Sequence, residues 1–314
     1  MKTPIDRRRF LRNGLGSAAG LALGSGLFGA GRAHAATTAT PLTATRLDDA
    51  LLLISGAGGN VVVAHEPQGL VFVDGGLKTR SSEVYKLATR TLTAKRAHTL
   101  LNTHWHPDVT GLNEQLGKDG AKIIAHENTR LWLSTDVQLE VDGKPIPRLP
   151  PKALPNATTY TGGKLDVGGQ EMRYGYLSQA HTDGDLFAYF TKSNVLVTGG
   201  VVAGGTWPTA DWVTGGWING TVAGYKTLLD LCDADTRVVT AQGARLYTRA
   251  ELEAERAMLA KLAEQLGKML RAGFGPADML AAAPAKEYVE KMGDPTQFLT
   301  ESFKSLWPRF APDA

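Results

Sequence analysis

A T-H-W-H-P-D segment at residues 103–108 constrains the possible fold more than any other part of the sequence. It directly follows Thr99–Asn102, a short apolar run that predicts a strand. In an extended backbone, residues i and i+2 point to the same side, so His104 and His106 can face one point in space while Trp105 points away. A third ligand for a metal at that point must come from elsewhere in the chain.

A second expected strand end supplies that ligand, because His181 stands in an A-H-T-D-G-D segment at residues 180–185. Three imidazoles with one open position form a catalytic zinc arrangement. The sequence therefore predicts one Zn²⁺ ion bound by His104, His106 and His181. A turn at the intervening proline can bring Asp108 close to the ion, where its carboxylate would orient a water molecule or accept its proton. We expect Asp108 to be the catalytic residue.

Strands and helices alternate along residues 47–247, which indicates an α/β sandwich domain. From Thr248 onward only helix is expected, so residues 248–314 are predicted to be a helical C-terminal extension. Thr248 is a plausible N-cap, with Glu251 three residues further on. The expected strands are Val61–Ala64, Leu70–Val73, Thr99–Asn102, Lys122–Ala125, Glu171–Leu177, Leu186–Phe190, Val195–Val197 and Arg237–Thr240.

Two irregular segments interrupt the alternation. Residues 135–163 contain five prolines and few periodic apolar residues, which predicts a long loop, and such loops are often functional. The second segment, Gly199–Gly220, is rich in glycine and contains Trp207, Trp212 and Trp217. These tryptophans are candidates for an aromatic wall of a substrate pocket, although hydrophobic packing explains them equally well.

Residues 1–35 are expected to be a removable signal. They combine a basic R-R-R-F-L-R cluster, an apolar run from Leu15 to Ala30 and an A-H-A cleavage pattern. This arrangement resembles a twin-arginine export signal, which implies a periplasmic protein. The alternative, a membrane anchor, is disfavoured because the run is short and rich in glycine. Residues 36–46 are expected to be a linker, and no stable membrane span is expected after the signal is removed.

The overall charge gives no indication of a nucleic-acid partner. Residues 1–35 contain six basic residues and one acidic residue, a net charge of +5, while the whole chain has +3, so the remainder carries −2. The basic pI of about 8.9 is therefore largely a property of the expected signal. The partner predicted from the sequence is a small-molecule substrate. The sequence does not indicate an oligomeric state.

The H-x-H-x-D run is similar to the H-x-H-x-D-H hallmark of the metallo-β-lactamase-fold superfamily. The chain resembles in particular periplasmic zinc hydrolases of the quinoprotein-relay or glyoxalase-II-like type. This resemblance implies a four-layer αββα sandwich, with two β-sheets between helices and the metal site at one sheet edge. The other segments that resemble the family are residues 55–60, 71–76, 125–127 and 180–185.

Three positions depart from the family pattern. The fourth histidine of the family falls on Val109, its bridging aspartate on Gly200 and its last histidine on Gln242. Valine and glycine offer no ligand atom, and glutamine offers only a weak oxygen ligand for zinc. In the family these positions serve a second metal, so the resemblance implies a degenerate second site beside a preserved first one. Gln242 remains a candidate for the substrate pocket.

The expected function is hydrolysis of an ester, thioester, lactone or lactam by water activated at a single zinc ion. Phosphodiester cleavage is disfavoured because it typically uses two metals in this family. The alternative is a catalytically inactive protein of the same fold that acts as a periplasmic binding or accessory protein. Iron-dependent oxygen chemistry is disfavoured because relatives with that activity use the aspartate replaced here by Gly200.

Overall fold

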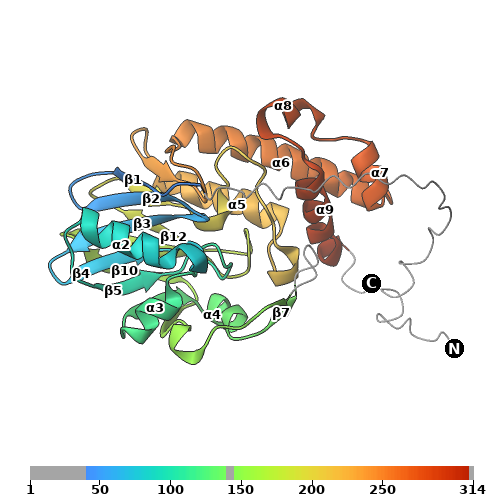
Figure 1. The fold of residues 1–314 in the computed structure, drawn as a ribbon. Coiled ribbons are helices and arrows are strands. Elements are labelled where there is room, and N and C mark those ends of the chain that lie inside the picture. Colours follow the sequence, from blue (N-terminus) through green and yellow to red (C-terminus); the bar gives the residue numbers. More distant parts are fainter. Residues whose placement is uncertain (1–39, 139–144, 311–314) are drawn as a thin grey trace, which may run out of the picture. The chain divides into compact units, whose positions relative to one another are not determined.

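The computed structural model describes residues 40–138 and 145–310 (Figure 1). The expected signal, residues 1–35, and the first part of the expected linker lie outside the described residues. Within these two ranges, no helix is both long enough and apolar enough to cross a membrane.

Seven strands form the first sheet. They are β1 (Thr43–Arg46), β2 (Leu51–Ala57), β3 (Gly59–Glu66), β4 (Gly69–Val73), β5 (Ala97–Leu101), β6 (Lys122–His126) and β9 (Ala157–Thr159). Their order in the sheet follows the sequence, with antiparallel pairing from β1 to β4 and parallel pairing from β4 to β9. The carboxyl ends of β4, β5 and β6 therefore meet at one edge.

Three of these strands, β1, β2 and β9, were not expected from the sequence, and β9 lies within the segment 135–163 that was predicted to be a loop. β2 is a nearly continuous apolar run buried on both faces, so it lacks the alternation that identifies a half-exposed strand. β1 is fully exposed and polar, but it pairs with β2 along its whole length, from Thr43 opposite Ser55 to Arg46 opposite Leu52. The expected linker is therefore shorter than residues 36–46, because its last four residues cover the edge of the sheet.

The second sheet has five strands. They are β10 (Gly162–Val167), β11 (Gln170–Leu177), β12 (Asp185–Phe190), β13 (Val195–Val197) and β14 (Arg237–Val239). Neighbours in this order pair antiparallel, except for the parallel pair β13 and β14. The strands from β11 to β14 were expected from the sequence.

Helices complete the fold on both sides (Figure 1). Among the described residues they are α2 (Ser81–Thr91), α3 (Asn113–Lys118), α4 (Glu127–Leu133), α5 (Ile218–Leu231), α6 (Arg249–Arg271), α7 (Pro276–Ala281), α8 (Val289–Met292) and α9 (Thr296–Phe310). Short 3₁₀ helices are η1 (Lys78–Arg80), η2 (Pro151–Ala153), η3 (Gly199–Val201), η4 (Trp212–Thr214) and η5 (Lys286–Tyr288).

Three apolar clusters separate the four layers. On β3, Val62 packs in the cluster between the two sheets, whereas its neighbour Val63 packs in the cluster beneath α2, as a period of two requires. The third cluster joins the outer face of the second sheet to the helices α5, α6 and α9, and it contains Leu196, Tyr225 and Phe303. This arrangement confirms the predicted αββα sandwich.

The C-terminal helices are integrated with the domain. The predicted cap is present, because the Thr248 hydroxyl accepts from the Glu251 amide and the Glu251 carboxylate accepts from the Thr248 amide. Leu259 on α6 and Phe303 on α9 are buried in the same cluster as Leu196 of β13. Residues 248–310 therefore form a helical region, as expected, that shares the core of the second sheet.

The proline-rich segment is more structured than a loop. It contains the short pair β7 (Val137–Gln138) and β8 (Pro145–Ile146), the helix η2, and the edge strand β9. Pro145 is compatible with β8 because this two-stranded ribbon requires few backbone donors. The segment thereby forms a wall beside the strand ends that carry the histidines.

Candidate metal centre

The three predicted histidines converge at the edge where the two sheets meet. His104 and His106 follow β5, and His181 follows β11. One ligand atom from each lies within 4.8 Å of the others, and the closest pair, His106 Nδ1 and His181 Nε2, is 2.9 Å apart. His104 and His181 are buried and His106 is half-buried. The structure thus brings together residues that are 75 positions apart in the chain.

Each imidazole has one nitrogen bound by the protein. His104 Nδ1 lies 3.0 Å from the Thr103 hydroxyl, and His181 Nδ1 lies 2.7 Å from the carbonyl oxygen of Thr209. His106 Nε2 lies 3.0 Å from Oδ2 of Asp211. Such partners fix the ring orientation and tautomer of a metal-binding histidine. The nitrogens left for a metal are Nε2 of His104, Nδ1 of His106 and Nε2 of His181.

Asp211 was missed in the sequence analysis. It lies in the glycine-rich segment between β13 and α5, where the tryptophans drew attention, and it is 105 residues from His106. Its Oδ2 accepts a hydrogen bond of 2.5 Å from the Thr214 hydroxyl, which in turn accepts from Trp105 Nε1 at 3.1 Å. The local sequence signal for Asp211 is a D-x-x-T turn at η4. Asp211 caps this short helix because its carboxylate accepts from the Thr214 amide.

His104 has a supporting carboxylate of its own. Asp74, at the end of β4, accepts hydrogen bonds of 2.8 Å from both the amide and the hydroxyl of Thr103. The Thr103 hydroxyl then reaches His104 Nδ1. Burial raises the pKa of Asp74 to about 8, although its hydrogen bonds with Thr103 oppose this shift. Asp74, in the family-like D-G-G motif after β4, therefore orients His104 indirectly, through Thr103.

The loop that carries His181 is fixed by Asp185. This carboxylate accepts from the His181 amide at 2.6 Å, and from the amide and hydroxyl of Thr182 at 2.8 and 2.7 Å. Burial raises the pKa of Asp185 to about 7 against these hydrogen bonds. Asp183 has another role, because its Oδ1 accepts from Trp132 Nε1 at 2.8 Å.

Burial favours the neutral form of two of the three imidazoles, those of His104 and His181. Burial, reinforced by the neighbouring histidines, lowers the pKa of His104 well below its ordinary value. Burial and the charge of His106 lower the pKa of His181 to about 4. Burial alone would raise the pKa of Asp211, but its contacts with His106 and Thr214 outweigh burial and lower it. Neutral His104 and His181, together with His106 backed by a carboxylate, are nitrogen donors that fit a zinc ion.

A cavity of about 230 Å³ opens onto the histidines. Asp108, Gln242 and Trp207 line it together with all three imidazoles. Trp207 is held from behind, because its ring stacks on Phe298 of α9 with centroids 4.7 Å apart, and its Nε1 donates to the Gly293 carbonyl at 2.9 Å.

The other two candidate tryptophans do not line this cavity. Trp212 lies in η4, with Lys304 Nζ 5.3 Å from its ring centroid. Trp217 directly precedes α5. It is partly buried and packs against the apolar cluster that joins the second sheet to α5, α6 and α9. Of the predicted aromatic wall, only Trp207 borders the metal cavity.

The three positions that depart from the family pattern offer few ligand atoms for a second metal. Val109 is buried, with 4% of its surface exposed. At Gly200, an added Cβ atom would lie 2.3 Å from His181 Cδ2, so no side chain fits there without displacing that ligand. Gln242 lines the cavity and is exposed. The three positions together offer one amide oxygen in place of two imidazoles and a carboxylate.

Comparison with known proteins supports this architecture. The family model described as the metallo-beta-lactamase superfamily matches residues 55–261. A metallo-beta-lactamase from Pontibacter korlensis superposes with a TM-score of 0.55 at 16% identity, over 70% of this chain and 99% of that chain. The sec-alkyl sulfatase PisA1 gives a TM-score of 0.62 at 14% identity, over 87% of this chain and 51% of that chain. At such identities these structures establish the fold alone.

A curated relative also matches this chain in sequence. It is the 2,4-dinitroanisole O-demethylase subunit alpha of Nocardioides sp. (strain JS1661), 29% identical over 131 residues. The match covers 41% of this chain and 36% of that protein, so the aligned part spans about a third of the length of the relative.

Proposed function

Because the chain belongs to the metallo-beta-lactamase superfamily, we propose that it is a hydrolase that uses one zinc ion on His104, His106 and His181. The proposed substrate carries an electrophilic ester, thioester, lactone or lactam. The observation that supports this most directly is the set of protein partners on the other nitrogens of the three imidazoles. These partners orient all three rings towards one point, which a purely structural histidine cluster would not require.

A zinc ion at this point supplies a Lewis acid that lowers the pKa of water to about 7 and polarises a carbonyl group. The chain contributes the remaining chemistry. Asp108 lines the same cavity and is half-buried, so its carboxylate can accept a proton from the attacking water or orient it. The backbone carbonyl of Asp108 accepts from the Gly59 amide at 3.1 Å, which holds this turn against the first sheet.

Two departures from the family pattern support a single ion. Gly200 leaves no room for a bridging carboxylate, and Val109 leaves only an apolar surface. Without a second metal, Asp108 is not required as a ligand and is available for proton transfer. The same loss disfavours phosphodiesters, whose cleavage gains most from two metal ions that clamp both oxygens.

The lining of the cavity favours a neutral substrate. Among the described residues around it there is no lysine or arginine. A carboxylate or phosphate on the substrate would therefore find no cationic side chain there. Trp207 offers an apolar face beside the histidines instead. The name of the Nocardioides relative describes a 2,4-dinitroanisole O-demethylase, which makes neutral aromatic compounds reasonable first substrates to test.

We further propose that the protein acts in the periplasm after twin-arginine export. The support is the R-R-R-F-L-R cluster, the glycine-rich apolar run and the A-H-A pattern within residues 1–35. Fractionation of cells that express the double variant Arg7→Lys/Arg8→Lys tests this assignment. The wild type is expected in the periplasmic fraction and the variant in the cytoplasm. The proposal would be refuted if the wild type and the variant were divided between the two fractions in the same proportions.

The decisive experiment measures metal content and hydrolysis on the same preparations. The wild-type protein should contain about one zinc ion per chain and hydrolyse a neutral aryl ester such as 4-nitrophenyl acetate. His106→Ala should lose both properties, whereas His65→Ala, which removes a histidine of β3, should keep both. Zinc without turnover on esters, thioesters, lactones and lactams would favour a binding or accessory protein. Absence of zinc after supplementation would rule out the hydrolase.

A further inference from the structure

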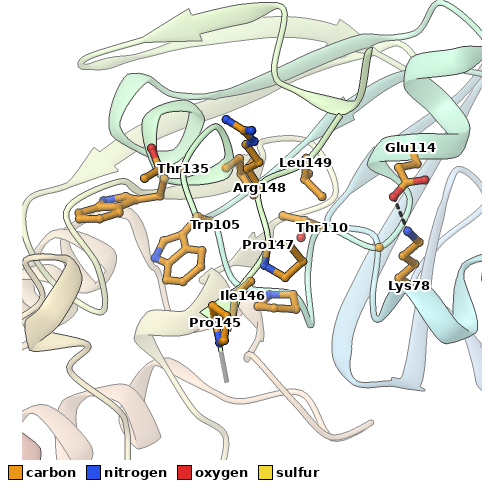
Figure 2. A pocket seen from close by; sticks show the side chains of 14 residues that line it. Lys78, Trp105, Thr110, Glu114, Thr135, Pro145, Ile146, Pro147, Arg148 and Leu149 are labelled. Carbon is orange, nitrogen blue, oxygen red and sulfur yellow. Dashed lines mark hydrogen bonds and ion pairs between the residues drawn. The ribbon is translucent and has the colours of Figure 1, made fainter. Parts of the chain in front are cut away.

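A second cavity, of about 450 Å³, lies on the opposite side of the metal loop and is called the rear cavity here (Figure 2). The loop divides its residues between the two spaces. His104, His106 and Asp108 line the metal cavity, whereas Trp105 and Pro107 line the rear cavity. The chain after β5 bends at residues 103–105 and turns at residues 107–109, and the side chains from His104 to Asp108 alternate between the two cavities. The volume lies within the range of small-molecule sites, roughly 300–1,000 Å³.

The walls of the rear cavity are mainly aromatic and aliphatic. Trp105 and Leu133 are 2% and 5% exposed, and with Val137 they form a small apolar cluster separate from the three main clusters. Ile146 and Leu149 pack against this cluster but remain half-buried. Trp105 and Leu133 leave little surface exposed, so a ligand with an apolar body would bury mainly the half-buried side chains of this wall.

A second tryptophan, Trp132, forms part of the same wall. Its ring centroid lies 6.3 Å from that of Trp105, with the planes inclined by 34°. Pro145 and Pro147 line the cavity with their flat rings (Figure 2). The half-buried ring of Trp132 and the exposed rings of Pro145 and Pro147 suit an aromatic ring system better than a branched aliphatic group.

The charged side chains at the rim of the rear cavity differ in whether they have an ion-pair partner. Lys78 is paired with Glu114, so these two residues contribute no net charge (Figure 2). Arg148 also lines the cavity and is exposed. Its backbone amide donates to Asp136 at 2.9 Å, but its guanidinium group has no partner among the described residues. Among the described residues, the rim therefore presents one cation without a side-chain partner, and its planar group is suited to a carboxylate.

We propose that the rear cavity is a second binding site, for a small aromatic carboxylate. The ring system lies between Trp132 and the segment of Ile146, and the carboxylate pairs with Arg148. This proposal is independent of the proposed hydrolysis, since it uses none of the zinc ligands. It assigns a function to the proline-rich segment, whose residues from Pro145 to Leu149 form one side of the cavity.

Both tryptophans of the wall are anchored to the segments that orient the metal site. Trp105 Nε1 donates to Thr214, which holds Asp211, and the ring of Trp105 lies 4.7 Å from that of His106. Trp132 Nε1 donates to Asp183, two residues from His181. These hydrogen bonds keep the rings in place when the cavity is open, so the site is preorganised for its ligand.

Calorimetric titration with a matched pair of probes tests the proposal. The probes are 1-naphthoate and the neutral 1-naphthalenemethanol, and the protein is used metal-free, because a carboxylate can also bind zinc. The wild type is expected to bind one naphthoate per chain. Arg148→Gln should weaken naphthoate binding about tenfold and leave the alcohol unchanged, because a charge-assisted hydrogen bond is lost. Ile146→Trp should abolish binding of both probes by filling the cavity.

The control is Arg173→Gln, which removes another exposed arginine, on β11, and should leave both affinities unchanged. Circular dichroism and zinc uptake establish that each variant is folded. A crystal structure with naphthoate gives an answer that depends on no variant, and the ring is expected against Trp132. Location of the ring elsewhere, absence of naphthoate binding to metal-free protein, or equal affinity in Ile146→Trp would overturn the proposal.

Discussion

Oδ2 of Asp211 lies 3.0 Å from Nε2 of His106, and the same oxygen accepts the Thr214 hydroxyl at 2.5 Å. A carboxylate in this position fixes the imidazole as the tautomer that binds metal through Nδ1, and it raises the basicity of that nitrogen. A residue remote in sequence therefore controls one of the three proposed zinc ligands.

Asp211→Ala is expected to weaken zinc binding about 10- to 100-fold, since His106 would lose its orienting partner. Competition with a chromophoric chelator measures this affinity. Asp230→Ala serves as the control, because Asp230 is exposed and pairs only with Lys226 on α5. Equal zinc affinities of the two variants would show that His106 does not need the carboxylate.

Asp108→Asn should lower kcat by about 10²–10⁴-fold, the usual contribution of a general acid–base group, and leave the zinc content near one ion per chain. The amide keeps the size of the side chain but cannot accept a proton. Steady-state kinetics with the ester substrate and elemental analysis of the same sample provide the measurement. Loss of zinc from this variant would instead identify Asp108 as a ligand.

Gly200→Ala should reduce zinc affinity and activity, because the new Cβ atom would approach within 2.3 Å of His181 Cδ2. The imidazole must then rotate away from the position that points Nε2 towards the metal. Gly275→Ala is a matched control, since a Cβ atom there meets only the Asp278 carboxylate at 3.5 Å. Full zinc affinity in Gly200→Ala would mean that the loop of η3 moves and that a side chain is tolerated.

Glu255 gives a pH-dependent prediction for stability. Burial raises the pKa of this carboxyl group on α6, against the hydrogen bonds that it accepts from Tyr225 and Tyr247. A raised folded-state pKa favours the protonated form, so this contribution to stability is fully present below the unfolded pKa of about 4.3 and is lost as the pH rises through the folded value.

Glu255→Gln removes this titration. The midpoint of urea unfolding of the variant, relative to wild type, should therefore increase between pH 4 and pH 8. Glu253→Gln, which changes an exposed glutamate paired with Arg249, should show a nearly constant difference across this range. A decrease in the relative stability of Glu255→Gln with rising pH would contradict the assigned direction of the shift.

Local sequence patterns were sufficient for much of the fold and for the three histidines that cluster in it. The i, i+2 spacing of His104 and His106 after a strand, and the T-x-x-E cap of α6, are properties of a few consecutive residues. The structure shows both. Two of the strands that the patterns missed lacked a local signal, since β2 is apolar on both faces and β1 is exposed along its whole length.

The tertiary structure decided what lies around the histidines. Asp211 and Thr209 reach their imidazoles from 105 and 28 residues away, and no spacing rule connects positions so distant. Likewise, Trp207 rather than Trp212 or Trp217 borders the cavity, because α9 holds its ring there. The sequence alone determined which residues can bind a metal, since that depends on side-chain chemistry and local periodicity. Which carboxylate orients each ligand depends on long-range packing, and only the folded chain decides it.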